Sequence, residues 1–155
     1  MKTNAMRILD SEKIAYEVLE YDTGDREFSG TLVADLLGLD YGSCYKTLTL
    51  IHEHDVYLAV ISVDKELDLK KCAKALNVKN LEMVHVKDLL KTIGYERGSV
   101  SPVGTKRVKG IIFDNEANNY EKIEISGGMK GISLLVDREE IIGYLKAKTG
   151  DITKI

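Results

Sequence analysis

Two apolar runs separated by four polar residues constrain the fold of this chain most strongly. Residues 44–51 and 56–63 are rich in β-branched and aromatic side chains, and His52-Glu53-His54-Asp55 lies between them. This pattern predicts two adjacent strands joined by a hairpin loop. Lys46 interrupts the first run, where burying an ammonium group is costly unless a partner compensates its charge. A lysine at this place either reaches solvent at a sheet edge or binds an anion.

The rest of the chain mixes helix and strand patterns without a linker or an internal repeat. Capping residues and apolar periodicity predict helices at residues 3–13, 29–38, 69–76, 87–93 and 137–148. Further strands are predicted at residues 14–21, 84–86, 109–113, 122–126 and 132–136. Because several strands follow one another through short turns, we expect an α/β (α+β) fold with a mixed, curled sheet flanked by helices.

The length and composition of the chain favour one ordinary globular domain over residues 1–155. No apolar stretch reaches the roughly 18 residues that a membrane span needs, and residues 1–7 lack the apolar core of a signal peptide. Cys44 and Cys72 are far apart and form no CxxC pair, which favours reduced thiols. We therefore expect a cytoplasmic protein without a membrane partner.

The formal net charge is −3, which argues against a protein that grips DNA through its overall field. Two segments, residues 69–79 and 97–113, are nevertheless basic and free of acids. They contain Lys70, Lys71, Lys74 and Lys79 in the first case, and Arg97, Lys106, Arg107 and Lys109 in the second. These cations form either solvated faces or a local phosphate-binding surface on an acidic body.

Two glycine-rich segments, at residues 94–104 and 126–131, are the clearest candidates for ligand contact. Glycine and serine leave backbone N–H groups uncovered, so such a loop can bind a phosphate, a carboxylate or a reaction oxyanion. A purely structural turn is the alternative for each segment. Neither segment has the spacing of a P-loop or of a dinucleotide-binding fingerprint.

Several short motifs occur in a characteristic order between about residues 5 and 150. They are Tyr45-Lys46-Thr47-Leu48, Leu67-Asp68-Leu69-Lys70-Lys71, Ala73-Lys74-Ala75-Leu76, Gly94-Tyr95, Gly98-x-x-Ser101-Pro102-x-Gly104 and Ser126-Gly127-Gly128-x-x-Gly131. In order and spacing they resemble the YbaK/EbsC family of free-standing aminoacyl-tRNA deacylases, whose domain is also inserted in many bacterial prolyl-tRNA synthetases. The resemblance implies a mixed sheet closed toward a barrel and flanked by helices.

The same resemblance implies the activity and the site. The expected reaction is trans-editing hydrolysis of misacylated tRNA(Pro), with Cys-tRNA(Pro) as the first candidate and Ala-tRNA(Pro) as the alternative. Mischarged tRNA(Pro) and prolyl-tRNA synthetase are the implied partners, and neither a cofactor nor a metal is expected. Catalytic roles are implied for Lys46 and Gly98. Substrate-binding roles are implied for Tyr21, Thr47, Ser101, Pro102, Ser126, Gly127 and Gly128.

The motif residues fit an ester whose leaving group is a tRNA hydroxyl. Lys46 would hold a phosphate, a ribose oxygen or the carbonyl, and amides near Gly98 would stabilise the oxyanion. No Ser-His-Asp arrangement is evident, so a bound water or the substrate's own thiol is expected to attack. A module that binds tRNA or the synthetase without hydrolysis is the second hypothesis.

Two positions depart from the family's pattern. Cysteine-selective members often carry an acid shortly after the second glycine segment, where this chain has Gly131-Ile132-Ser133. They commonly have valine where this chain has Cys44, which on a strand shares a face with Lys46. A thiol beside an ammonium group could act as a nucleophile, although we favour a packed thiol. His52 and His54, with Asp55, could bind a metal, but we favour a polar hairpin tip, which explains them without one.

Overall fold

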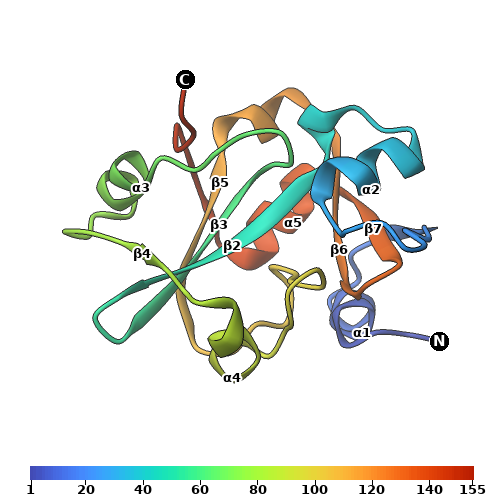
Figure 1. Ribbon diagram of the computed structural model, residues 1–155, viewed down its shortest axis with the longest axis horizontal. Coiled ribbons are helices and arrows are strands. Elements are labelled where there is room, and N and C mark those ends of the chain that lie inside the picture. The colour runs from blue at the N-terminus through green and yellow to red at the C-terminus, as the bar shows by residue number, and fades with distance from the viewer.

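The computed structural model describes residues 1–155, and its larger sheet contains the predicted hairpin (Figure 1). The strand order is β4-β2-β3-β5-β8, with β2 at Tyr45–His52, β3 at Asp55–Ser62, β4 at Glu82–Met83, β5 at Val108–Asp114 and β8 at Lys148–Gly150. β2 and β3 pair antiparallel, with Lys46 opposite Ile61. β5 pairs parallel with both β3 and β8, so the sheet is mixed.

The smaller sheet consists of three antiparallel strands in the order β1-β7-β6. β1 is Tyr16–Glu20, β6 is Lys122–Met129 and β7 is Ile132–Asp137. A β-bulge interrupts the pairing of β6 with β7 between Ser126 and Met129. The residue just before β2 approaches β6 through a bridge between Cys44 and Glu124. That contact joins the two sheets at the place where the cavity described below opens.

Four of the five helices begin where the sequence supplies a capping side chain. α1 is Asn4–Ser11, α2 is Gly30–Leu37, α3 is Leu69–Leu76, α4 is Leu89–Ile93 and α5 is Arg138–Leu145, with short 3₁₀ turns at Tyr41–Ser43, Val86–Asp88 and Asn115–Asn119. The side chains of Thr3, Ser29, Asp68 and Asp137 each accept a hydrogen bond from an amide in the first turn that follows. Such a cap typically contributes about 0.5–2 kcal/mol, which explains why the predicted starts are accurate.

The larger sheet is buried on both faces. Ala59 and Ile61 of β3 belong to one apolar cluster with residues of α3, whereas Val60 belongs to another that includes residues of α1 and α5. Figure 1 shows α3 on the opposite side of the molecule from β6, β7 and α1. The mixed α/β architecture with flanking helices is therefore confirmed. No helix combines the length and apolarity needed to cross a membrane.

Three predicted segments differ from the structure. Residues 84–86 are not a strand, because the pairing partner of β2 is Glu82–Met83 and a 3₁₀ turn starts at Val86. Residues 126–131 are not a free loop, since β6 continues to Met129 and turns tightly into β7. The chain after α5 forms β8 rather than more helix. In the first and third cases pairing with a strand distant in sequence decides the local structure, and in the second the hairpin pairing of β6 with β7 does.

Candidate active site

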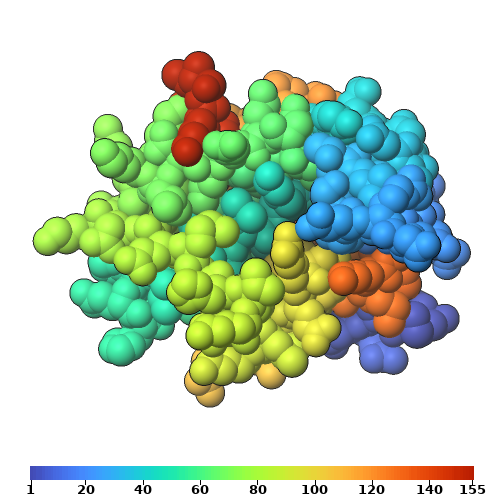
Figure 2. Space-filling model, viewed as in Figure 1, coloured from blue at the N-terminus to red at the C-terminus, as the bar shows by residue number.

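A cavity of about 530 Å³ lies where the two sheets meet. Its walls come from the chain after β1, the start of α2, the first half of β2, residues 83–100, and strands β6 and β7. Figure 2 shows a recess near the centre of the molecule, with teal atoms of β2 at its floor between the blue segment before α2 and the yellow-green segment around residues 80–100. Segments far apart in sequence therefore meet around one hollow.

Five of the nine predicted site residues line this cavity. They are Tyr21, Lys46, Thr47, Gly98 and Ser126. The other four, Ser101, Pro102, Gly127 and Gly128, are not among the lining residues. The structure thus brings together the lysine, one residue of each glycine-rich segment and the tyrosine that follows β1.

Lys46 is half-buried and has no acidic partner within ion-pair distance. Its Nζ donates one long hydrogen bond of 3.4 Å to the Val63 carbonyl. Burial lowers the pKa of the lysine, and the negative charges of Asp64 and Glu66 partly oppose that shift. An ammonium group with a single weak acceptor retains donors that an anionic or carbonyl ligand can use.

Gly98 lines the cavity. Its φ of 88° lies in the left-handed region, which glycine adopts without steric cost. In the same turn the Ser99 amide donates to the Glu96 carbonyl, whereas the Gly98 amide donates to no protein acceptor. An uncommitted amide beside a cavity can act as an oxyanion donor.

Ser126 connects the two glycine-rich segments. Its Oγ donates to the Ser99 carbonyl at 3.1 Å and accepts from the Gly128 amide at 3.1 Å. Gly127 packs so closely on β7 that a Cβ would lie 2.7 Å from Ile132 Cγ2. Gly128 has a φ of 91° and lies against Tyr95. The hydrogen bond from Ser126 to Ser99 holds the turn that follows Gly98, while Gly127 and Gly128 pack against Ile132 and Tyr95 outside the cavity lining.

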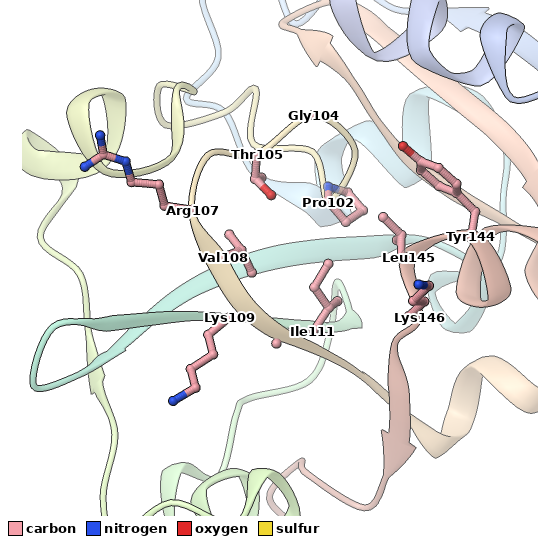
Figure 3. A pocket seen from close by; sticks show the side chains of 11 residues that line it. Pro102, Gly104, Thr105, Arg107, Val108, Lys109, Ile111, Tyr144, Leu145 and Lys146 are labelled. Atoms are coloured by element: carbon pink, nitrogen blue, oxygen red, sulfur yellow. The ribbon is translucent and has the colours of Figure 1, made fainter.

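Ser101 and Pro102 are buried beneath the first glycine-rich segment. Ser101 Oγ accepts a hydrogen bond from the Val103 amide at 3.1 Å, which fixes the turn. Pro102 instead lines a second hollow of about 450 Å³, beside Thr105 and Tyr144. In Figure 3 the Arg107 and Lys109 side chains extend away from Pro102 and Tyr144. The charged groups of Arg107 and Lys109 therefore do not point into this second hollow.

Tyr21 is half-buried at the cavity, and its amide donates to the Gly131 carbonyl at 3.0 Å. Burial raises the pKa of its phenol, to which the nearby charge of Glu124 adds. Thr47 is also half-buried and faces Val60 across the β2–β3 pair. Both residues can offer a hydroxyl to a ligand without carrying charge.

Cys44 is fully buried, and burial together with the charge of Glu124 raises the pKa of its thiol to about 12. The charges that act on this thiol are acidic, so Lys46 does not activate it. Cys44 packs in a small apolar cluster with Ala34 and Val63. The alternative of a nucleophilic Cys44 therefore lacks support, and the packed thiol agrees with the structure.

Two charged residues of the cavity were not assigned to the site from the sequence. Arg97 is exposed, lines the cavity and forms no ion pair, so it can meet a phosphate at the mouth. Glu124 is only 4% exposed and also lines the cavity. The sequence Ile123-Glu124-Ile125 contained a signal for Glu124. Burying an acid within an apolar strand is costly without a partner, as it is for Lys46.

The two basic segments lie apart. Residues 70–79 belong to α3 and the chain after it, on the side of the larger sheet away from β6 and β7 (Figure 1). Lys71 pairs there with Asp151 at 3.1 Å, and Lys109 pairs with Asp55 at 3.0 Å. Among these cations only Arg97 lines the large cavity.

At the hairpin tip His52 Nδ1 lies 3.0 Å from Asn80 Oδ1, and no three metal-binding side chains cluster anywhere in the chain.

Comparisons with known proteins identify the family of this chain. The sequence model of the family described as "Aminoacyl-tRNA editing domain" matches residues 31–144. A protein of Enterococcus faecalis named "Putative Cys-tRNA(Pro)/Cys-tRNA(Cys) deacylase EbsC" is 37% identical over 98% of this chain and 93% of its own length. A proline--tRNA ligase of Fervidobacterium nodosum is 29% identical over 77% of this chain, which corresponds to 22% of the ligase.

Solved structures show the same fold. A crystal structure described as "a putative trans-editing enzyme for prolyl tRNA synthetase" superposes with a TM-score of 0.83 at 21% sequence identity. The superposition covers 100% of this chain and 99% of that chain. The resemblance identified in the sequence is thus confirmed: this chain belongs to the aminoacyl-tRNA editing domain family.

Proposed function

We propose that this protein hydrolyses mischarged tRNA(Pro) in trans, with Cys-tRNA(Pro) as its substrate. The enzyme class, an aminoacyl-tRNA deacylase, follows from membership of the editing family. The observation that carries the proposal is a cavity lined both by a half-buried, unpaired Lys46 and by Gly98, whose amide has no acceptor in the protein. These two groups are the donors that an ester with an adjacent phosphodiester requires.

In this proposal Lys46 binds the carbonyl or a phosphate or ribose oxygen of the terminal adenosine. The Gly98 amide donates to the carbonyl oxygen as negative charge develops on it. Arg97, at the exposed edge of the cavity, meets a phosphate of the tRNA end. Tyr21 and Thr47 complete the wall against which the aminoacyl group packs, and Ser126 positions the Gly98 turn through Ser99.

The nucleophile comes from the substrate. The cavity contains no histidine, and the buried thiol of Cys44 has a raised pKa of about 12. The thiol of a cysteinyl ester can instead attack its own carbonyl. The new S–C bond closes a thiolactone, the ester C–O bond breaks, and the thiol proton passes to the ribose oxygen. Water then opens the released thiolactone, which completes the net hydrolysis. An alanyl ester lacks this route and would need a bound water.

The partners follow from the same chemistry. The relatives include a protein named as a deacylase of Cys-tRNA(Pro) and two proline--tRNA ligases, which supports mischarged tRNA(Pro) as ligand and prolyl-tRNA synthetase as partner. With a net charge of −3, the chain should bind free tRNA weakly and in a salt-sensitive manner. Prolyl-tRNA synthetase would then supply the selection of tRNA(Pro), in the cytoplasm.

Hydrolysis of Cys-tRNA(Pro), Ala-tRNA(Pro) and Pro-tRNA(Pro) by the wild type and by Lys46→Ala tests the proposal. Lys65→Ala is the matched control, since Lys65 is an exposed lysine that does not line the cavity. A charge-assisted hydrogen bond is worth about 1.5–3 kcal/mol, so Lys46→Ala should lower kcat/KM by at least about tenfold. Lys65→Ala should leave kcat/KM unchanged.

The outcomes separate the alternatives. Rapid loss of the cysteinyl ester alone, dependent on Lys46, supports the proposal. Preferential loss of the alanyl ester would replace cysteine by alanine as the edited residue. If no ester is hydrolysed even with prolyl-tRNA synthetase present, the deacylase proposal fails and a non-catalytic tRNA-binding or synthetase-binding module takes its place.

A further inference from the structure

Glu124 is a buried acid in the cavity wall that no cation of the protein neutralises. Its residue is 4% exposed, and no ammonium or guanidinium group lies within ion-pair distance of its carboxylate. The titratable groups near it are the Cys44 thiol and the Tyr21 phenol, both uncharged at neutral pH. Lys46 lines the same cavity, but the acids that act on it are Asp64 and Glu66. The two opposite charges thus share one cavity without pairing.

The surroundings of Glu124 are polar but incompletely satisfied. Thr49 Oγ1 and Ser133 Oγ are buried in the same cavity wall, and neither has a hydrogen-bond partner in the protein. Ser133 lies diagonally opposite Glu124 in the β6–β7 pair, because Ser126 is the residue directly facing Ser133. Buried hydroxyl groups normally find a partner, so an unpartnered Ser133 hydroxyl beside the unpaired Glu124 carboxylate indicates a ligand.

The free energy of an unpaired buried carboxylate explains what kind of ligand fits. Burial raises the pKa of Glu124 to about 7, although the Ser133 hydroxyl, the Tyr45 amide and the Cys44 thiol lie close enough to oppose the shift. The charged form is therefore available at neutral pH but poorly compensated. A cationic group that enters the cavity would supply the missing counter-charge. A neutral hydroxyl oxygen can accept a hydrogen bond from one of its remaining N–H groups.

We propose that Glu124, with Ser133, binds the protonated α-amino group of the aminoacyl ester. This inference rests on the proposed function, because an aminoacyl ester carries an ammonium group one carbon away from the reacting carbonyl. Glu124 and Lys46 then bind opposite ends of one ligand, the ammonium group and the oxygens near the ester. Since every aminoacyl ester has this ammonium group, the subsite orients the ester and excludes N-acylated esters, leaving side-chain selection to the other walls.

Binding of two non-hydrolysable probes tests the subsite independently of catalysis. The probes are 3′-deoxy-3′-(L-alanylamino)adenosine and its N-acetyl derivative, and their dissociation constants are measured by calorimetry or NMR titration at pH 7.5. The wild type should bind the free amine at least tenfold more tightly than the N-acetyl form. Glu124→Gln should reduce this ratio to about one. Glu121→Gln, which changes an exposed acid at the start of the same segment, should keep it.

The pH dependence of the wild type gives a second readout that needs no variant. Below pH 7 the free protein holds a proton on Glu124, so binding of the ammonium group must release it. The affinity for the free amine should fall at least fivefold from pH 7.5 to 5.5, while the affinity for the N-acetyl form stays constant.

Equal affinities of the wild type for both probes, binding of neither at millimolar concentration, or an unchanged ratio in Glu124→Gln would overturn the subsite. The hydrolysis assay tests the deacylase proposal, and the binding assay tests the subsite, so the two proposals can fail independently. A wild type that hydrolyses no mischarged tRNA but prefers the free amine refutes the deacylase proposal and leaves the subsite standing. A wild type that hydrolyses its ester but shows no preference between the probes refutes the subsite alone.

Discussion

Replacing Gly98 by alanine should damage catalysis far more than folding, and Gly94→Ala provides the matched control. The two glycines have nearly identical left-handed backbones, with φ of 88° and 87°. Placing a non-glycine residue in that region costs about 1–2 kcal/mol. The added Cβ would meet only the flexible side chain of Lys130 at Gly98, at 2.6 Å, and of Lys106 at Gly94, at 3.4 Å. The backbone strain is therefore comparable at both sites.

The two variants should differ in activity because only Gly98 lines the cavity. For a chain of this length each kcal/mol lowers Tm by about 2–4 °C, so both variants should lose about 2–8 °C. A displaced oxyanion donor costs roughly 10²-fold or more in rate. We expect kcat/KM for the mischarged tRNA to fall about 10²-fold in Gly98→Ala and less than threefold in Gly94→Ala, at a temperature where both are folded. Equal activities of the two variants at equal Tm would refute the role of the Gly98 amide.

Three further predictions follow from the cavity wall. Cys44→Val should keep deacylation, because the thiol is buried with a pKa raised to about 12, and a loss greater than about tenfold would contradict this. Ser126→Ala removes the hydrogen bonds to the Ser99 carbonyl and the Gly128 amide, each worth about 0.5–1.5 kcal/mol. We therefore expect Tm to fall and kcat/KM to drop about tenfold. An unchanged kcat/KM would limit Ser126 to a stabilising role. Burial raises the pKa of Glu124 from 4.5 to about 7, so the folded state binds this proton more tightly and the free energy of unfolding should fall between pH 4.5 and pH 7. Glu124→Gln should remove up to ~3 kcal/mol of that fall, measured by urea unfolding at pH 4.5 and 8, and identical pH profiles of the two proteins would contradict the shift.

The site was only partly visible in the sequence. Lys46 stood out because a charge within an apolar strand needs an explanation, and Gly98 because of its motif. Ser101 and Pro102 belong to the same motif, yet they support the turn from beneath rather than line the cavity. Glu124 was overlooked because its place in the cavity wall depends on the bridge to Cys44 and on the diagonal neighbour Ser133. Both of these residues come from other segments of the chain.

Local sequence determined the elements whose signals are contained within a few residues. The hairpin of β2 and β3, the caps at Thr3, Ser29, Asp68 and Asp137, and the mixed α/β class all follow from short-range patterns of apolar, capping and turn residues. The order of motifs likewise determined the editing family. Tertiary structure alone decided the split into two sheets, the two-residue strand β4 and the parallel strand β8, because their hydrogen bonds join segments far apart in the chain. It also decided which polar groups share the cavity, since burial and the charge of neighbours depend on packing that no local pattern records.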